Sequence, residues 1–240
     1  KINDLEKFHR KHYNTEKICI AIAGSLTEEI YKIFEKSDLS GINKNPIYED
    51  PNFLNLKNNP SLKIRNGRES IKFDNLEFSR IFMAWLIPNL NDQKSIIGLE
   101  ILASILCVGR NSRLVKTLRE ESNLVESVYI DVNAGELGGL FIIEANCEYK
   151  DIYLVEKQIN KIIDEMLNFK PTTLDEIKKA INIVKSNYVF NLETSTQLSS
   201  FFGNELLWGR KSSINHLENH LIYWSDLDNF KKIIEYISGD

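Results

Sequence analysis

Two pairs of histidines are the residues of this chain whose type and spacing could hold a metal ion. They lie in His9-Arg10-Lys11-His12 and in His216-Leu217-Glu218-Asn219-His220. A hydrolytic zinc site on a helix needs two imidazoles one turn apart and a glutamate that activates the metal-bound water. The first pair has no glutamate between its histidines, and Glu218 projects from a different side of a helix than its neighbouring histidines. Because no third ligand is evident, we interpret both as polar helix surfaces. A metallohydrolase built on His216 and His220 is the alternative.

Three other groups of residues could carry chemistry, but each has a structural interpretation. The arginines of Gly109-Arg110-Asn111-Ser112-Arg113 could meet a peptide carboxylate, but a position between two expected helices favours helix caps and solvated charge. The glycine-rich segment 134–139 forms a turn and lacks the following helix that a phosphate-binding loop requires. The tryptophans follow helical or strand periodicity, which is typical of core packing: Trp85, Trp208 and Trp224.

The composition is that of a folded protein with a sizeable core. Its 240 residues are 42% hydrophobic and 27% charged, which excludes a disordered chain. The net charge is −4, from 30 basic and 34 acidic residues, and no basic cluster occurs. Nucleic acid is therefore excluded as the expected partner.

Membrane and compartment signals are also absent from the sequence. No apolar run reaches the roughly 18–20 residues needed to span a bilayer, and residues 1–6 contain no signal-peptide core. Cys19, Cys107 and Cys147 are odd in number and far apart, which favours buried free thiols in a reducing compartment. We therefore expect a cytoplasmic protein with no membrane partner. Because the chain begins with lysine, we expect it to be a piece of a longer protein.

The elements that must position these residues are short strands and amphipathic helices. An apolar, β-branched run at Ile18–Ala23 predicts a buried strand between a helix at Asp4–Tyr13 and a helix capped by Thr27. Prolines, glycines and asparagines from Leu39 to Arg68 predict a linker and a domain boundary.

Beyond the linker the pattern predicts one continuous domain. Ile71 and Phe73 alternate with polar residues, and Thr173 with Glu176 forms a capping box for a helix through Tyr188. The other expected elements are a strand at Ser79–Ile87, a buried helix at Gln93–Cys107, an amphipathic helix at Ser112–Glu121, a hairpin of 127–133 and 139–148, a helix at Asp151–Phe169, and a last helix at Asp226–Ile237 capped by Ser225. This order predicts an α+β fold, with helices packed on one face of an antiparallel sheet.

A series of short motifs follows in close order from residue 102 to residue 128. They are Leu102-Ala103-Ser104-Ile105-Leu106, Gly109, Ser112-Arg113-Leu114, Leu118-Arg119-Glu120, Leu124-Val125 and Ser127-Val128. On either side lie Ile20-Ala21-Ile22-Ala23-Gly24, Gly138-Gly139-Leu140-Phe141 and Leu174-Asp175-Glu176-Ile177-Lys178-Lys179-Ala180. In this order and spacing they resemble the insulinase/pitrilysin family of zinc metallopeptidases, and the resemblance covers nearly the whole chain.

The resemblance implies a domain organisation and a place for zinc. Family members pair two homologous halves around a closed chamber, and the first half binds zinc through His-x-x-Glu-His and a distal glutamate. By resemblance, residues 1–40 are the tail of the first, catalytic half-domain, 41–68 are the linker, and 69–240 are the second, non-catalytic half-domain. This chain lacks the zinc motif. We therefore expect zinc in the full-length protein or its partner, none in this fragment, and no activity of the fragment alone.

The resemblance also implies two substrate-binding positions, an arginine and a tyrosine seven residues later that contact the bound peptide. The arginine matches Arg119, whereas Glu126 replaces the tyrosine. An ionised carboxylate cannot donate a hydrogen bond, so the pair is altered. Tyr129 lies on the same expected strand but faces the other side.

The expected function is closure of the chamber and binding of a peptide or partly unfolded protein, together with the missing N-terminal half-domain. The alternative is an inactive partner or scaffold subunit that assembles, as a homodimer or heterodimer, with a zinc-bearing peptidase subunit. A His-x-x-Glu-His motif before Lys1 would distinguish the two.

Overall fold

The chain forms two compact units in a computed structural model that describes residues 1–13, 18–37, 66–73, 76–168, 172–207 and 214–238. The first unit comprises residues 1–59 and 187–213, and the second comprises 60–186 and 214–240. Most of the predicted linker, 41–68, lies outside the described residues, so the predicted domain boundaries stay a prediction. None of the described helices is both long and apolar enough to cross a membrane.

The described residues of the first unit form three short helices and little core. They are α1 (Ile2–His12), α2 (Glu28–Glu35) and α7 (Ser195–Leu207), together with the last turn of α6 (Leu174–Phe190). Wherever the structure describes side-chain burial up to position 37, the residues are not buried. Ala21 lies beside Gly203 of α7, where an added Cβ would come within 3.2 Å of the alanine methyl. Apart from this contact, the large apolar residues described in this unit are mostly exposed.

The predicted strand at Ile18–Ala23 is wrong for this structure. The segment has no regular secondary structure, and Ile18, Ile20 and Ile22 are 39–48% exposed. A strand exists only when a neighbouring strand accepts its hydrogen bonds, and no described residue pairs with this segment. The alternating pattern of Ile71 and Phe73 likewise forms no strand in the described chain.

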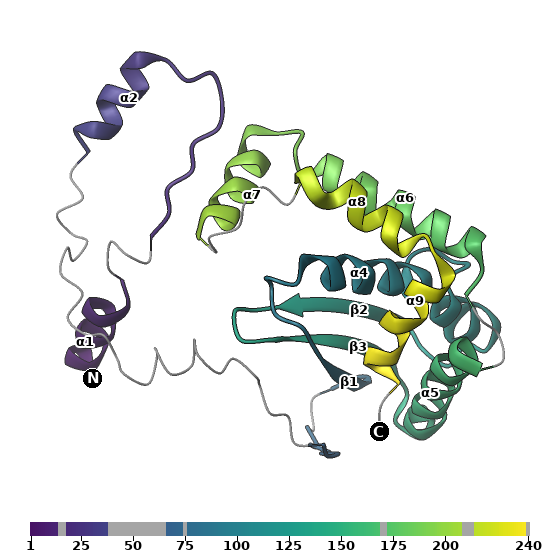
Figure 1. The fold of residues 1–240 in the computed structure, drawn as a ribbon. Coiled ribbons are helices and arrows are strands. Elements are labelled where there is room, and N and C mark those ends of the chain that lie inside the picture. The colour runs from purple at the N-terminus through teal and green to yellow at the C-terminus, as the bar shows by residue number, and fades with distance from the viewer. Residues whose placement is uncertain (14–17, 38–65, 74–75, 169–171, 208–213, 239–240) are drawn as a thin grey trace. The chain divides into compact units, whose positions relative to one another are not determined.

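The second unit is a three-stranded antiparallel sheet with helices packed on one face (Figure 1). The strand order is β1-β3-β2, and the two later strands form the predicted hairpin. The strands are β1 (Ser79–Ile87), β2 (Ser127–Ala134) and β3 (Gly139–Cys147). The helices and helical turns are α4 (Gln93–Cys107), the π-helix η2 (Val115–Glu121), η3 (Tyr149–Asp151), α5 (Ile152–Asn168), most of α6, α8 (Ile214–Trp224), α9 (Leu227–Ile234) and η4 (Glu235–Ile237). The predicted α+β fold is confirmed.

The two faces of this sheet differ in burial because side chains alternate along each strand. The face toward the helices contains the fully buried Phe141, Ile143 and Ala145, with Val128 beside them. The opposite face, which we name the open face, carries Phe82 and Leu86 of β1, the half-buried Leu140, Ile142 and Glu144 of β3, and Tyr129, Asp131 and Asn133 of β2.

The core of the second unit lies between the sheet and its helices. Leu99, Ile101, Leu102 and Leu106 of α4 are completely buried, as the apolar pattern around this helix predicts. Trp224 fastens α8 to the start of α4, because its indole Nε1 donates a 2.7 Å hydrogen bond to the Lys94 carbonyl oxygen. The predicted cap of the last helix is wrong by one residue, since the Asp226 side chain accepts from the Asn229 N–H.

Candidate functional site

Arg119 lies on a π-helix at the point where the chain passes from α4 to the hairpin. The sequence predicts an ordinary amphipathic helix over Ser112–Glu121, but residues Val115–Glu121 form a π-helix. Val115 and Leu118 are buried against the core. Asn123, with φ of 49°, ends the helix in the left-handed region. π-helical turns are rare and occur frequently at functional sites.

The Arg119 side chain points into solvent. It is exposed and, among the described residues, has no ion pair or hydrogen bond. Of the neighbours that could neutralise it, Glu121 is instead 3.7 Å from the Lys116 ammonium. A guanidinium in this state is available as a donor to a ligand carbonyl or carboxylate.

Glu126 is also exposed and directly precedes β2. Its backbone N–H donates a 2.8 Å hydrogen bond to the Asn146 carbonyl oxygen, which aligns it with the end of β3. The register places Tyr129 on the open face and Val128 on the core face. The structure thus places Arg119 and Glu126 at the same end of the hairpin without a direct interaction between them.

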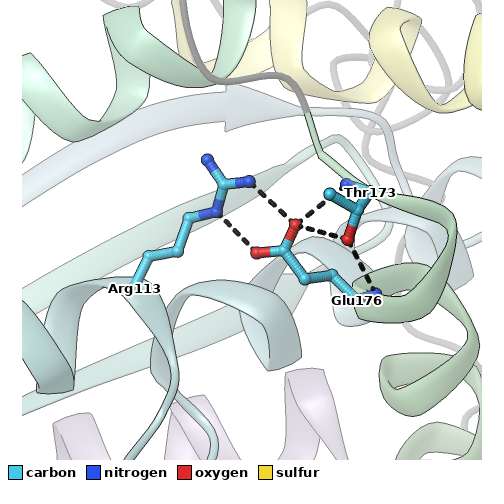
Figure 2. Close-up of polar contacts among 3 residues, drawn as sticks. All are labelled: Arg113, Thr173 and Glu176. Carbon is cyan, nitrogen blue, oxygen red and sulfur yellow. Dashed lines mark hydrogen bonds and ion pairs between the residues drawn. The ribbon is translucent and has the colours of Figure 1, made fainter.

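A second arginine, Arg113, has a structural partner that the sequence analysis missed. Its Nε and Nη2 atoms each lie 2.9 Å from an oxygen of the Glu176 carboxylate (Figure 2). The same carboxylate accepts hydrogen bonds from the backbone N–H and hydroxyl of Thr173, at 2.8 and 3.1 Å. The Thr173 hydroxyl in turn accepts from the Glu176 N–H at 3.2 Å. The predicted capping box is confirmed, and an arginine from the turn before η2 completes it.

These contacts change the acidity of Glu176. Partial burial raises its pKa, but hydrogen bonds from Arg113 and Thr173, together with the arginine charge, outweigh burial and hold the pKa below its ordinary value. The side chains of Arg113 and Glu176 are 18% and 33% exposed. The pair thus joins the start of η2 to the start of α6.

The histidine pairs do not form a metal centre in the described part of the chain. His216 and His220 lie on α8 with ring centroids 6.4 Å apart, but no group of three His, Cys, Asp or Glu side chains among the described residues could hold a metal. Glu218 is occupied by the Lys185 ammonium at 2.9 Å. In α1, His9 stacks on Tyr13 and His12 contacts the ring of Phe8. These residues do not fit a zinc site.

The histidine nearest the core is nevertheless perturbed. Burial lowers the pKa of His220, and the charges of His216 and Lys94 lower it further, whereas Asp92 raises it. The Lys94 ammonium itself lies 3.2 Å from the centre of the Tyr223 ring.

The three cysteines are free thiols in the structure. Cys147 is buried, whereas Cys19 and Cys107 are only partly buried, so the expectation of burial holds fully for one of them. Desolvation raises the pKa of Cys107 to about 11, and its Sγ–H donates to the Val128 carbonyl oxygen at 3.1 Å. A thiol with so high a pKa is not a nucleophile near neutral pH.

Comparison with known proteins assigns the chain to a family. Residues 1–184 match the family model described as the peptidase M16 inactive domain. An uncharacterized zinc protease of Streptomyces coelicolor is 26% identical over 230 residues, which cover 89% of this chain and 46% of that protein. The uncharacterized zinc protease YmxG of Bacillus subtilis is 22% identical over 222 residues, covering 91% of this chain and 51% of the relative. The chain thus spans about half the length of these relatives.

Solved structures share its fold. A protease from Helicobacter pylori superposes with a TM-score of 0.77 at 13% identity, covering 100% of this chain and 57% of that chain. A peptidase M16 inactive domain from Pseudomonas fluorescens gives a TM-score of 0.69 at 17% identity, over 97% of this chain and 53% of that one. The family match, the relatives and the fold agree with the insulinase/pitrilysin-type motifs: the chain belongs to the peptidase M16 inactive-domain family.

Proposed function

We propose that this chain is the non-catalytic half of a zinc-dependent peptidase, which closes the chamber over a peptide and binds that peptide through Arg119. The exposed guanidinium on the π-helix, with no described partner, is the observation that carries the proposal. The family match and the relatives named as zinc proteases support it. The substrate is a peptide or partly unfolded protein, and a catalytic half-domain completes the enzyme.

In this proposal the two halves divide the chemistry. The catalytic half or a partner subunit would hold the zinc, which would supply the activation of water and the polarisation of the scissile carbonyl. Arg119 donates hydrogen bonds to the peptide backbone and to developing negative charge on the carbonyl oxygen. Glu126, exposed beside the start of β2, contacts the peptide but cannot supply the donor that a tyrosine phenol would. The chain alone does not hydrolyse peptides.

The test pairs this chain with a zinc-bearing catalytic half and measures peptide hydrolysis. Arg119→Ala is expected to lower kcat/KM by about ten- to a thousandfold, the range for one lost transition-state donor. The matched control is Lys116→Ala, which removes another exposed cation from the same helix and is expected to leave turnover unchanged. Glu126→Tyr is expected to raise activity if the missing phenol limits it. Unchanged turnover in both Arg119→Ala and Glu126→Tyr would contradict the substrate-binding role.

The second candidate is an inactive partner subunit, favoured by Glu126 in the position where the family has a tyrosine. A relative 27% identical over 154 residues, covering 60% of this chain and 34% of that protein, is named mitochondrial-processing peptidase subunit alpha-2 of Dictyostelium discoideum. The two candidates differ in the residues that precede Lys1 in the whole protein. A His-x-x-Glu-His motif there supports a peptidase in one chain, and its absence supports a subunit that assembles with a zinc-bearing partner.

A further inference from the structure

The open face of the sheet carries one acidic residue between two aromatic rings. The register places Phe82 of β1 directly opposite Glu144 of β3, and Glu144 directly opposite Tyr129 of β2. Phe82 and Tyr129 lie on the two edge strands and are each 60% exposed, so both present large aromatic side chains to solvent on the open face. We name these three residues the aromatic–acid row.

The spacing of the row suits a long side chain. Adjacent strands lie about 4.8 Å apart, so the two aromatic residues stand about 10 Å apart with the carboxylate between them. In the described part of the chain, Glu144 has neither an ion pair nor a hydrogen-bond partner for its side chain. The half-buried carboxylate of Glu144, flanked by the two aromatic residues, thus has acceptors that a ligand can use.

The neighbouring residues reinforce the negative end and add an apolar floor. In the next row, Ala84, Ile142 and the exposed Asp131 lie side by side across the three strands. Asp131 places a second carboxylate about 7 Å diagonally from Glu144. Strands β1–β3 carry one basic residue on this face, Arg80. It lies on the other side of the row from Asp131, two residues before Phe82. The cation-attracting end is therefore the side of Asp131.

We propose that the aromatic–acid row binds the arginine side chain of an extended peptide lying across the open face. A guanidinium forms charge-assisted hydrogen bonds with Glu144 and stacks on the rings of Phe82 and Tyr129. The hydrocarbon stem packs on Ile142. This inference rests on the proposed function for the peptide's role as a substrate, and it names the substrate class as peptides with a basic residue.

Binding of matched peptides to the 240-residue chain tests the inference directly. Two fluorescein-labelled peptides differ only at one position, arginine or its uncharged analogue citrulline, and anisotropy gives Kd for each. The arginine peptide is expected to bind about tenfold more tightly at low salt, with the ratio falling as ionic strength rises. Glu144→Gln is expected to bring the ratio to about one, and Phe82→Ala to lower it several-fold.

The matched control is Asp164→Asn, which removes an exposed acid from α5, on the helix-covered side of the sheet. It is expected to leave the ratio unchanged. All these positions are at least partly exposed, so circular dichroism and unfolding midpoints are expected to match the parent chain. A ratio near one in the parent chain, or one that survives Glu144→Gln, would overturn the inference. So would sedimentation showing that a second copy of the chain covers this face and is released by Phe82→Ala.

Hydrolysis separates this inference from the proposed function. If the chain paired with a catalytic half cleaves both peptides equally well and binds them equally, the function stands and the aromatic–acid row has no such role. If the chain binds arginine selectively through Glu144 but no assembled enzyme cleaves either peptide, the row stands as a binding site and the peptidase role is wrong.

Discussion

The ion pair between Arg113 and Glu176 should hold the connection between η2 and the start of α6, and its contribution can be measured. Glu176→Ala removes the capping box, worth about 1 kcal/mol, because the Thr173 N–H loses its acceptor. It also removes the paired hydrogen bonds from Arg113. Since a third of the Glu176 side chain is exposed, solvent screening reduces these to about 1 kcal/mol. The expected loss in unfolding free energy is about 2 kcal/mol.

A double-mutant cycle isolates the pair from the cap. Glu176→Gln keeps the capping acceptor but not the charge, and Arg113→Met keeps the volume of the side chain but not its donors. Urea unfolding followed by tryptophan fluorescence is expected to give a coupling energy of about 1 kcal/mol between the two substitutions. The control is Glu218→Gln, which breaks a pair whose side chains are 49% and 62% exposed and is expected to cost less than about 0.5 kcal/mol. A coupling energy indistinguishable from zero would refute the argument.

The pair also predicts a pH dependence with a definite sign. The folded protein holds the pKa of Glu176 below its ordinary value, so the folded state favours the charged form more than the unfolded state does. The stabilisation is therefore complete above about pH 4.5 and is lost as the pH falls through the lowered pKa of the folded state. In Glu176→Gln this part of the acid dependence should disappear.

Three further predictions concern the helical layer of the second unit and its histidines. Gly98→Ala would place a Cβ 2.7 Å from Ile233 Cγ1 and 2.8 Å from Trp224 Cε2. This overpacking is expected to lower the free energy of unfolding in urea by about 1–2 kcal/mol, because the higher helix propensity of alanine offsets only part of it. Unaltered stability would contradict this close packing. Because the pKa of His220 is lowered in the folded state, its contribution to stability is complete above about pH 6.5 and falls as the histidine becomes protonated. His220→Asn should therefore flatten the dependence of the unfolding free energy on pH between neutral and mildly acidic pH. An unchanged profile would exclude His220 as the source of that dependence. After dialysis, metal analysis is expected to find far less than one zinc per chain, and stoichiometric zinc abolished by His216→Ala would show the expectation to be wrong.

Local sequence pattern predicts the elements whose apolar runs are clearly bounded. The strand at Ser79–Ile87 and the helix at Gln93–Cys107 have the bounds that their apolar runs predict, because both bury side chains in the core and are flanked by clear stop signals. The capping box of Thr173 and Glu176 follows from residues three apart, so the chain itself brings them together. The short motifs around Arg119 likewise predict the family from sequence alone, and the family match confirms it.

Tertiary structure determined the features that depend on residues far apart in the chain. Ile18–Ala23 has the composition of a strand but no described neighbour to pair with, so its pattern does not become one. Arg113 lies 63 residues from Glu176, and no local rule predicts which acid will neutralise it. Arg119 lies on a π-helix, in which each backbone hydrogen bond spans one residue more than in the α-helix that the sequence pattern predicts.

The same holds for the open face of the sheet. Phe82, Tyr129 and Glu144 belong to three strands, and each alternates in sequence with core residues. Alternation shows that each residue lies on one side of its own strand, but the register alone aligns the three in one row. A shift of one residue in any pairing would turn that strand's side chains to the other face. The register is set by burial of Phe141, Ile143 and Ala145 against the helices, a contact between distant segments that no single strand's sequence contains.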